Sequence, residues 1–260
     1  MKIVGFGQLH NELSNKNLEN WFRCMGFCDY IYIYDQASDD GSLEYYKKHD
    51  NVITIESPVN NFERTTTCKS LLLNKLLSEH PDTDWIFWID GDTILDGRML
   101  RNNAKEVYTL LGEASKHMID GIVMGHYNLW RSDIHYRVDS EYDWFHKNGR
   151  KVFWRNNGLL RFVDNGAPGA AGIHQPQFPQ GLRKQVRIDR DLIHRGFATD
   201  EQIFNKYNLY KAEGQSGRDL ERLLDEENLA VEQIGGDILP DWYEVSDTTA
   251  PTLKRRLKDL

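Results

Sequence analysis

The first hundred residues alternate between two kinds of hydrophobic pattern, and this alternation is the feature that most limits the possible folds. Short apolar and β-branched runs typical of strands are KIVGF at 2–6, YIYIY at 30–34, VITI at 52–55 and DWIFWI at 84–89. A segment with helical spacing of its apolar residues follows each of the first three runs. In the third, TTTCKSLLLNKLLSEH at 65–80, we expect Leu72, Leu76 and Leu77 on the buried side. Repeated steps from strand to helix predict an α/β fold with a largely parallel sheet flanked by helices.

The second half of the chain is less regular. We predict a helix near 98–114, then a strand in GIVMGHYNLW at 121–130, and then an irregular region rich in Trp, Tyr, Arg and Gly. No repeat, low-complexity tract or linker divides the sequence. We therefore expect 1–260 to form one domain, with its later part over the carboxyl edge of the sheet.

Composition excludes several classes of protein. A chain of 260 residues with 40% hydrophobic and 12% aromatic content can bury a substantial core. A formal charge of −8 disfavours nucleic acid as a partner, because binding to phosphate backbones needs clustered Lys and Arg. No run approaches the roughly 18 apolar residues of a membrane span, and the N-terminus lacks the apolar core of a secretory signal. We expect a cytoplasmic protein with no integral membrane segment.

The fourth predicted strand ends in two aspartates, Asp90 and Asp92, separated only by Gly91. Ligands of open α/β sheets bind beyond the carboxyl ends of the strands. Strand alternation would place both carboxylates on one side, and the glycine would leave room for a ligand near the backbone. Such a pair suits a hard divalent cation bridging to a diphosphate. The alternative is that both aspartates are turn and cap residues before the next helix.

The segment HNELSNKNLENWFRCMGFCDYIYIYDQASDDGSLEYY, at 10–46, resembles the opening of the family-2-like glycosyltransferases of GT-A fold. With the acidic pair, the resemblance covers about the first hundred residues. It is weak again until LIHRGFATDEQIFNKYNLY at 192–210, which is similar to a late H-x-G segment and its following helix. The matching positions in the opening are Asn11, Glu12, Trp21, Gly26, Asp35, Ser38, Asp40 and Gly41.

The resemblance implies a GT-A-type fold and a metal-dependent glycosyltransferase. Such an enzyme moves a sugar from a UDP-, GDP- or dTDP-sugar to a carbohydrate or other hydroxyl acceptor, usually with inversion. Residues 1–97 would then bind the nucleotide sugar, and 98–260 would form the acceptor side. Two alternatives stay open. A nucleotidyltransferase of related α/β fold usually has a basic glycine-rich loop, which GFGQLHNE is not, and a non-catalytic carbohydrate-binding protein has no need of an acidic pair.

The resemblance also implies where the donor binds. Asp35 should lie near the base or ribose, the loop bearing Glu12 should line the same pocket, and Asp90 is also expected to reach the ribose. Turn formation and helix capping are the alternative roles for the first two acids. Arg64 and Lys69, just before and within the third predicted helix, are the nearest basic candidates for the diphosphate or the base.

A histidine is expected to complete the metal site. The segment VRIDRDLIH at 186–194 predicts a strand, and adding it to the sheet would bring His194 beside Asp90 and Asp92. A neutral imidazole suits Mn²⁺ better than Mg²⁺, so we expect Mn²⁺, or else Mg²⁺, as the cofactor. His174, in a glycine-rich loop, is the competing ligand.

Direct in-line attack by the acceptor needs one carboxylate as general base. Asp133 and Asp139, which follow the predicted strand at 121–130, are the candidates, with Asp200 and Glu201 as alternatives. Sugar rings also pack well on indole faces, so some tryptophans of the irregular region are acceptor-site candidates. These are Trp130, Trp144 and Trp154.

Overall fold

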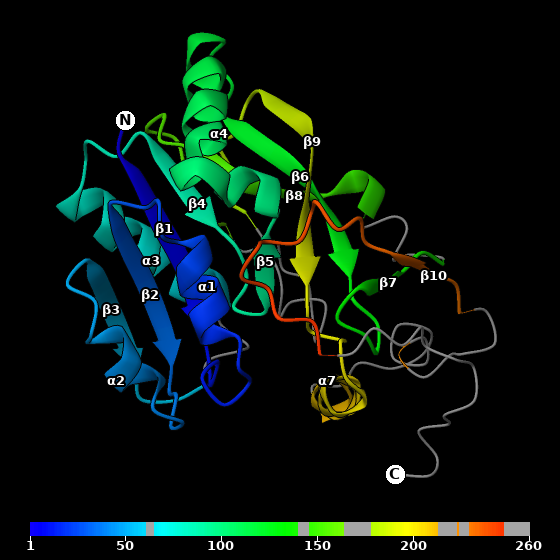
Figure 1. Ribbon diagram of the computed structural model, residues 1–260. Coiled ribbons are helices and arrows are strands. Elements are labelled where there is room, and N and C mark those ends of the chain that lie inside the picture. Colours follow the sequence, from blue (N-terminus) through cyan, green and yellow to red (C-terminus); the bar gives the residue numbers. More distant parts are fainter. Residues whose placement is uncertain (61–64, 140–145, 164–177, 213–222, 224–228, 247–260) are drawn as a thin grey trace.

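The computed structural model shows one eight-stranded sheet in the order β3-β2-β1-β4-β8-β6-β9-β5 (Figure 1). The strands in this order are Val52–Ser57, Tyr30–Gln36, Ile3–Leu9, Trp85–Trp88, Arg150–Arg155, Gly121–Asn128, Gln185–His194 and Thr93–Leu95. The structure describes residues 1–60, 65–139, 146–163, 178–212, 223 and 229–246.

The sheet is mixed but mostly parallel. Strands β3, β2, β1 and β4 pair in parallel, and so do β6 and β9. Strand β8 runs antiparallel to both β4 and β6, and β5 runs antiparallel to β9. A separate antiparallel pair joins β7 (His135–Arg137) to β10 (Val231–Gln233). The predicted α/β class with a largely parallel sheet is confirmed.

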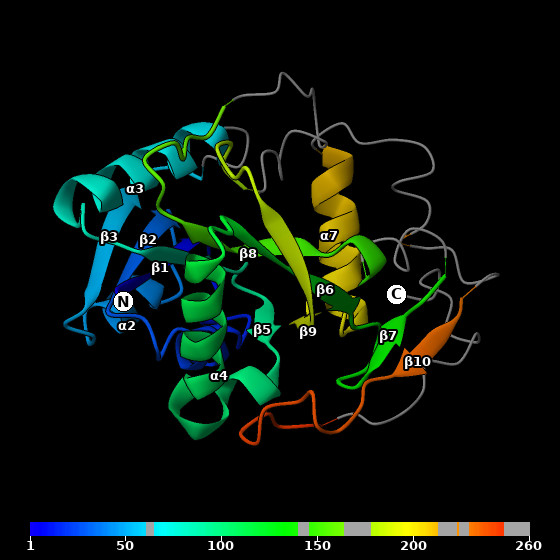
Figure 2. The ribbon, with the colours of Figure 1, turned by 90° about the horizontal axis from the view of Figure 1, so that it is seen from above.

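Helices cover both faces of this sheet. They are α1 (Leu18–Cys24), α2 (Ser42–Tyr46), α3 (Thr65–Glu79), α4 (Gly97–Lys116) and α7 (Asp200–Ala212). Figure 2 shows α4 on one face and α3 with α7 on the other. In the described part of the chain no helix combines the length and the apolar character needed to cross a membrane.

Strand alternation divides the core into two layers. On one face Ile3 and Phe87 pack with the apolar side chains of α1 and α4. On the other face the neighbouring residues Val4 and Ile86 pack against α3. Because successive side chains of a strand point to opposite faces, the apolar runs seen in the sequence supply both layers at once.

Candidate functional site

The acidic pair lies in the turn between β4 and β5, at the carboxyl edge of the parallel strands (Figure 1). Neither aspartate caps the following helix, since the side chain of Asp96 accepts the backbone N–H of Arg98 at 2.9 Å. Of the alternative roles given for Asp90 and Asp92, the capping role is therefore excluded, whereas both residues do lie in a turn. The two carboxylates differ in the side chains that they contact.

Asp92 is bound by two side chains from the second half of the chain. Its Oδ2 lies 3.1 Å from Nε2 of His194 and 3.1 Å from Nζ of Lys206. His194 ends β9, where the sheet pairs it with Asn128 of β6 and with Thr93 of β5. The predicted strand thus exists and brings its terminal imidazole to the acidic pair. Lys206, on α7, was not predicted as a site residue.

Hydrogen bonding orients the imidazole of His194. Its Nδ1 lies 3.0 Å from Oδ1 of Asn128 and its Nε2 lies 3.1 Å from Oδ2 of Asp92, so one neutral tautomer donates to Asn128 and the other donates to Asp92. A cation bound at Nε2 would select the first tautomer. Burial lowers the pKa of His194, and the opposing effect of Asp92 does not restore it, so the ring is neutral. Nε2 and the carboxylate of Asp92 both face the ammonium of Lys206, which lies 3.4 Å from Nε2.

Asp92 and Lys206 each stabilise the charged form of the other. Burial favours the neutral acid, but His194 and Lys206 hold the pKa of Asp92 well below its usual range. Burial also disfavours the ammonium, yet Asp92 raises the pKa of Lys206 above its ordinary value. Both groups are therefore ionised at neutral pH and form a buried ion pair.

Asp90 has a cation of its own. Its Oδ2 lies 2.5 Å from Nη1 of Arg150, at the start of β8. Its side chain is 38% exposed, compared with 18% for Asp92. The turn therefore presents one carboxylate outward beside an arginine and one inward beside a lysine.

Glu12 fills the space beside Gly91. A Cβ at Gly91 would lie 2.8 Å from Cγ of Glu12 and closer still to its carboxyl group. The glycine therefore makes room for this side chain, and not for a ligand as the sequence had indicated. The carboxyl accepts the amide of Asn17 at 3.0 Å, and burial, with the charge of Asp92 adding, raises the pKa of Glu12 to about 8. Glu12 is thus largely protonated at neutral pH.

The other predicted donor-site residues lie in different settings. The carboxylate of Asp35 is fully buried and accepts the backbone N–H and the hydroxyl of Ser38 at 2.8 and 2.7 Å, as a turn residue would. The ammonium of Lys69 lies 4.9 Å from the ring of Trp88, and burial lowers its pKa to about 8 against the effect of Asp90. Arg64 lies outside the described residues.

The candidate bases are engaged with other side chains. Asp133 accepts the backbone N–H and hydroxyl of Ser246 at 2.9 and 2.7 Å, and it lies 3.8 Å from Arg195. Asp139 binds the buried guanidinium of Arg137 at 2.6 Å. Of the two alternatives, Asp200 lies 2.6 Å from Arg131, and Glu201 is exposed on the first turn of α7.

Two of the tryptophans proposed for the acceptor site belong to the core. The side chains of Trp130 and Trp154 are fully buried among apolar neighbours, so neither offers a face to a sugar. The prediction for these two was wrong, because an irregular sequence region was read as an exposed one. Trp144 and the competing ligand His174 lie outside the described residues.

A further histidine lies beside the site and was missed in the sequence. His126, in the middle of β6, is 1% exposed, and its ring centroid is 5.0 Å from that of His194. Within the described part of the chain neither of its ring nitrogens has a hydrogen-bond partner. Burial lowers its pKa far below the ordinary value, so the ring is neutral. The signal available in the sequence was a histidine inside the otherwise apolar run GIVMGHYN.

The donor set fits a divalent cation that is shared with a ligand. Two ligands at right angles on a cation with bonds of about 2.1 Å are about 3 Å apart, and Oδ2 of Asp92 is 3.1 Å from Nε2 of His194. The described residues contain no cluster of three or more His, Cys, Asp or Glu side chains arranged to hold a metal. Mg²⁺ is commonly held by one or two carboxylates together with substrate phosphates, and two protein donors agree with that mode.

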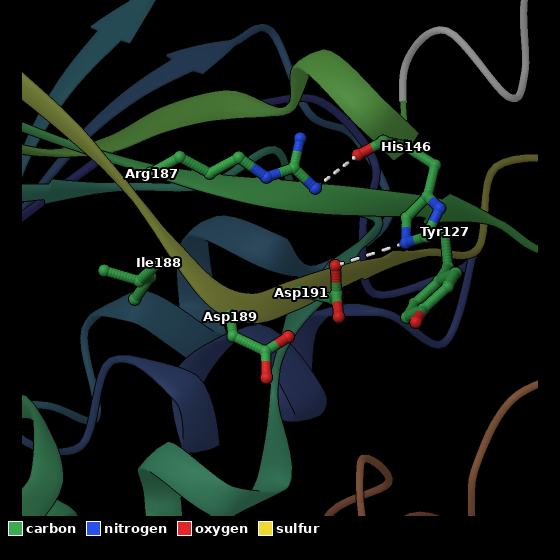
Figure 3. Close-up of a pocket in the computed structure, with 6 residues that line it drawn as sticks. All are labelled: Tyr127, His146, Arg187, Ile188, Asp189 and Asp191. Carbon is green, nitrogen blue, oxygen red and sulfur yellow. Dashed lines mark hydrogen bonds and ion pairs between the residues drawn. The ribbon is translucent and has the colours of Figure 1, made fainter.

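A separate polar pocket of about 390 Å³ lies on the opposite face of β6 and β9 (Figure 3). Tyr127 and Asp191 line it and alternate along their strands with His126 and Leu192. The ring of His146 stacks on Tyr127, and its Nε2 lies 3.4 Å from Asp191. Strand alternation therefore separates this pocket from the acidic pair.

Comparisons with known proteins find only distant structural likenesses. No protein-family profile matches it, and no curated protein is a detectable relative. Solved structures do match. HddC from Yersinia pseudotuberculosis is 13% identical, with a TM-score of 0.40 over 79% of this chain and 97% of that one. A glycosyltransferase involved in glycosylation of the major capsid of PBCV-1 is 12% identical, with a TM-score of 0.36 over 83% and 100%.

The enzyme 4-diphosphocytidyl-2C-methyl-D-erythritol synthase from Anaerococcus prevotii is 10% identical, with a TM-score of 0.29 over 86% of this chain and 81% of that one. The likenesses are distant. The α/β fold described above rests on the strand order of the chain itself, and its function has to be argued from the site.

Proposed function

We propose that the protein is a metal-assisted glycosyltransferase that moves a sugar from a nucleotide-sugar donor to a carbohydrate or other hydroxyl acceptor. One observation carries the proposal. Two electron-pair donors, the carboxylate of Asp92 and the neutral imidazole of His194, converge at the carboxyl edge of the sheet beside two cationic side chains, Arg150 and Lys206. The first pair suits a cation and the second pair suits a diphosphate.

The roles follow from this arrangement. Asp92 and His194 would hold Mn²⁺, or Mg²⁺ as a poorer match for the imidazole. The bound cation would neutralise charge on the leaving diphosphate. Arg150 and Lys206 would give their N–H groups to phosphate oxygens. Asp90, the more exposed carboxylate, would reach the ribose or hold the cation through water.

Transfer also needs a base for the acceptor proton, and we propose Asp133 ahead of Asp139. Asp133 lies 3.8 Å from Arg195, whose backbone N–H binds the carbonyl of Asp92 at 2.8 Å. Arg195 therefore links Asp133 to the acidic turn. Asp139 is held by Arg137, which is itself buried.

The test is incubation with a panel of UDP-, GDP- and dTDP-sugars and Mn²⁺. Metal-dependent hydrolysis of one sugar nucleotide is expected, and Asp92→Asn should lower its rate by about a hundredfold or more, since the variant would hold less firmly the cation whose charge stabilises the leaving group. Asp241→Asn is the matched control, because Asp241 is 79% exposed and its partner Arg101 is also exposed, at 39%. Its rate should equal that of the wild type.

Other outcomes would overturn the proposal. Release of pyrophosphate from a nucleoside triphosphate and a sugar phosphate would identify a nucleotidyltransferase. Absence of metal-dependent nucleotide binding would favour a non-catalytic carbohydrate-binding protein. Full activity of a folded Asp92→Asn variant at limiting Mn²⁺ would show that the metal site lies elsewhere.

A further inference from the structure

The ammonium of Lys206 lies where the two electron-pair donors of the site converge. It is 3.1 Å from Oδ2 of Asp92 and 3.4 Å from Nε2 of His194. These are the same two atoms whose spacing fits a divalent cation. A monovalent cation belonging to the chain therefore stands close to the place that a divalent one would need.

The surrounding fold makes room for this ammonium. Lys206 reaches the site from the second turn of α7, and its Nζ lies 4.6 Å from the ring centroid of Phe197. A Cβ at Gly196 would overlap Nζ of Lys206 and would lie 2.5 Å from Oδ2 of Asp92. Gly196 thus lets the ammonium approach the acidic turn.

The arrangement sets two cations in competition for one carboxylate. Oδ2 of Asp92 accepts from Lys206 in the structure, and a divalent ion bound at the same oxygen would stand beside a positive charge at short range. That repulsion disfavours binding of the divalent ion unless the ammonium of Lys206 moves to another anion. A diphosphate, which carries several negative oxygens, is such an anion and would also complete the coordination of the ion.

We infer that Lys206 is an internal counter-ion that occupies the cation site until a nucleoside diphosphate draws it away, so that the divalent cation and the donor bind cooperatively. The inference rests on the proposed function. Coupling of this kind is reciprocal: the diphosphate strengthens binding of the cation by the same factor by which the cation strengthens binding of the diphosphate.

The test compares Mn²⁺ binding by wild type, Lys206→Met and Lys211→Met, followed by electron paramagnetic resonance of free Mn²⁺. Lys211 is the matched control, because it lies on the same helix, is exposed and carries the same charge. Without nucleotide, Lys206→Met should bind Mn²⁺ roughly tenfold more tightly than wild type, within the usual range of coupling energies. Lys211→Met should match wild type. Thermal unfolding and a Lys206→Gln variant check that the effect is not a folding defect.

A second arm adds UDP, GDP or dTDP. One of them should tighten Mn²⁺ binding to wild type, and the enhancement should be smaller in Lys206→Met. Equal Mn²⁺ affinity of wild type and Lys206→Met without nucleotide would overturn the role of Lys206 and leave the proposed metal site standing. Failure of every protein to bind Mn²⁺, with each diphosphate present, would overturn both.

Discussion

At the residue scale, the site consists of acids that each have a different neutralising partner. Asp90 has a guanidinium, Asp92 has an ammonium, and Glu12 keeps a proton because burial and the charge of Asp92 oppose its ionisation. Three carboxyl groups from two segments can therefore lie close together without accumulating negative charge. The same arrangement makes the folded state sensitive to pH.

Glu12 should make the protein less stable as pH rises. Its pKa is about 8 in the folded state and about 4.5 when the chain is unfolded, so between these values the unfolded state loses the proton and the folded state keeps it. The unfolded state then binds fewer protons, and the free energy of unfolding falls with rising pH through this window. A Glu12→Gln variant lacks this titration, and its amide oxygen can still accept from Asn17.

The measurement is the melting temperature of both proteins across the window. Wild type should lose stability relative to Glu12→Gln as the pH is raised from about 5 to about 8, and the difference should level off above that. A difference that stays constant across the window would show that Glu12 ionises in the folded protein near its ordinary pKa.

The sequence indicated those site residues that stand at strand ends. Asp90, Asp92 and His194 each follow or end an apolar run, and the carboxyl edge of a sheet brings such positions together. Arg150 and Lys206 could not be found in this way. Each stands among ordinary polar residues in the sequence. The position of Arg150 depends on how β8 pairs with the sheet, and that of Lys206 depends on how α7 packs against it. These are long-range contacts, which leave no local pattern in the sequence.

At the element scale, periodicity predicted the position of α3 more accurately than its buried face. The helix spans Thr65–Glu79, close to the expected segment. Leu72, Leu73 and Leu76 are buried, whereas Leu77, which was expected inside, is only partly covered. A run of leucines places apolar side chains on more than one face of the helix. Which face is buried therefore depends on how the helix lies across β1 and β2.

Two leucines of this helix provide a matched test of the packing. Leu76 is fully buried in the layer between α3 and the sheet, and Leu71 is 50% exposed on the same helix. Leu76→Ala should lower the free energy of unfolding by about 2–5 kcal/mol, because it removes buried methyl groups and leaves a cavity. Leu71→Ala should change it by about 0.5 kcal/mol or less. Chemical denaturation of both variants measures this, and equal effects would show that α3 does not pack through Leu76.

At the scale of the whole molecule, the sheet joins the two halves that the sequence distinguished. Strand β4 of the first half pairs with β8 of the second, from Trp85 opposite Arg155 to Phe87 opposite Phe153. Strand β5, which also precedes residue 97, pairs with β9 at the far edge of the sheet. The acidic turn lies between β4 and β5 and so depends on strands from both halves. The sequence indicated only that the strand at 186–194 joins the sheet, because strand order is set by pairings between distant segments.

This topology predicts that the chain unfolds in one cooperative step. Separating residues 1–97 from the rest would break the pairing of β4 with β8 and of β5 with β9, and it would expose the apolar side chains of Phe87 and Phe153, whose ring centroids are 4.7 Å apart. Neither half can then keep its structure while the other unfolds. Far-UV circular dichroism and tryptophan fluorescence should give coincident denaturant transitions, since Trp21 reports on the first half and Trp130 on the second. Single replacements of these two tryptophans by Phe assign the fluorescence to each half, and two transitions with separate midpoints would show that the halves fold independently.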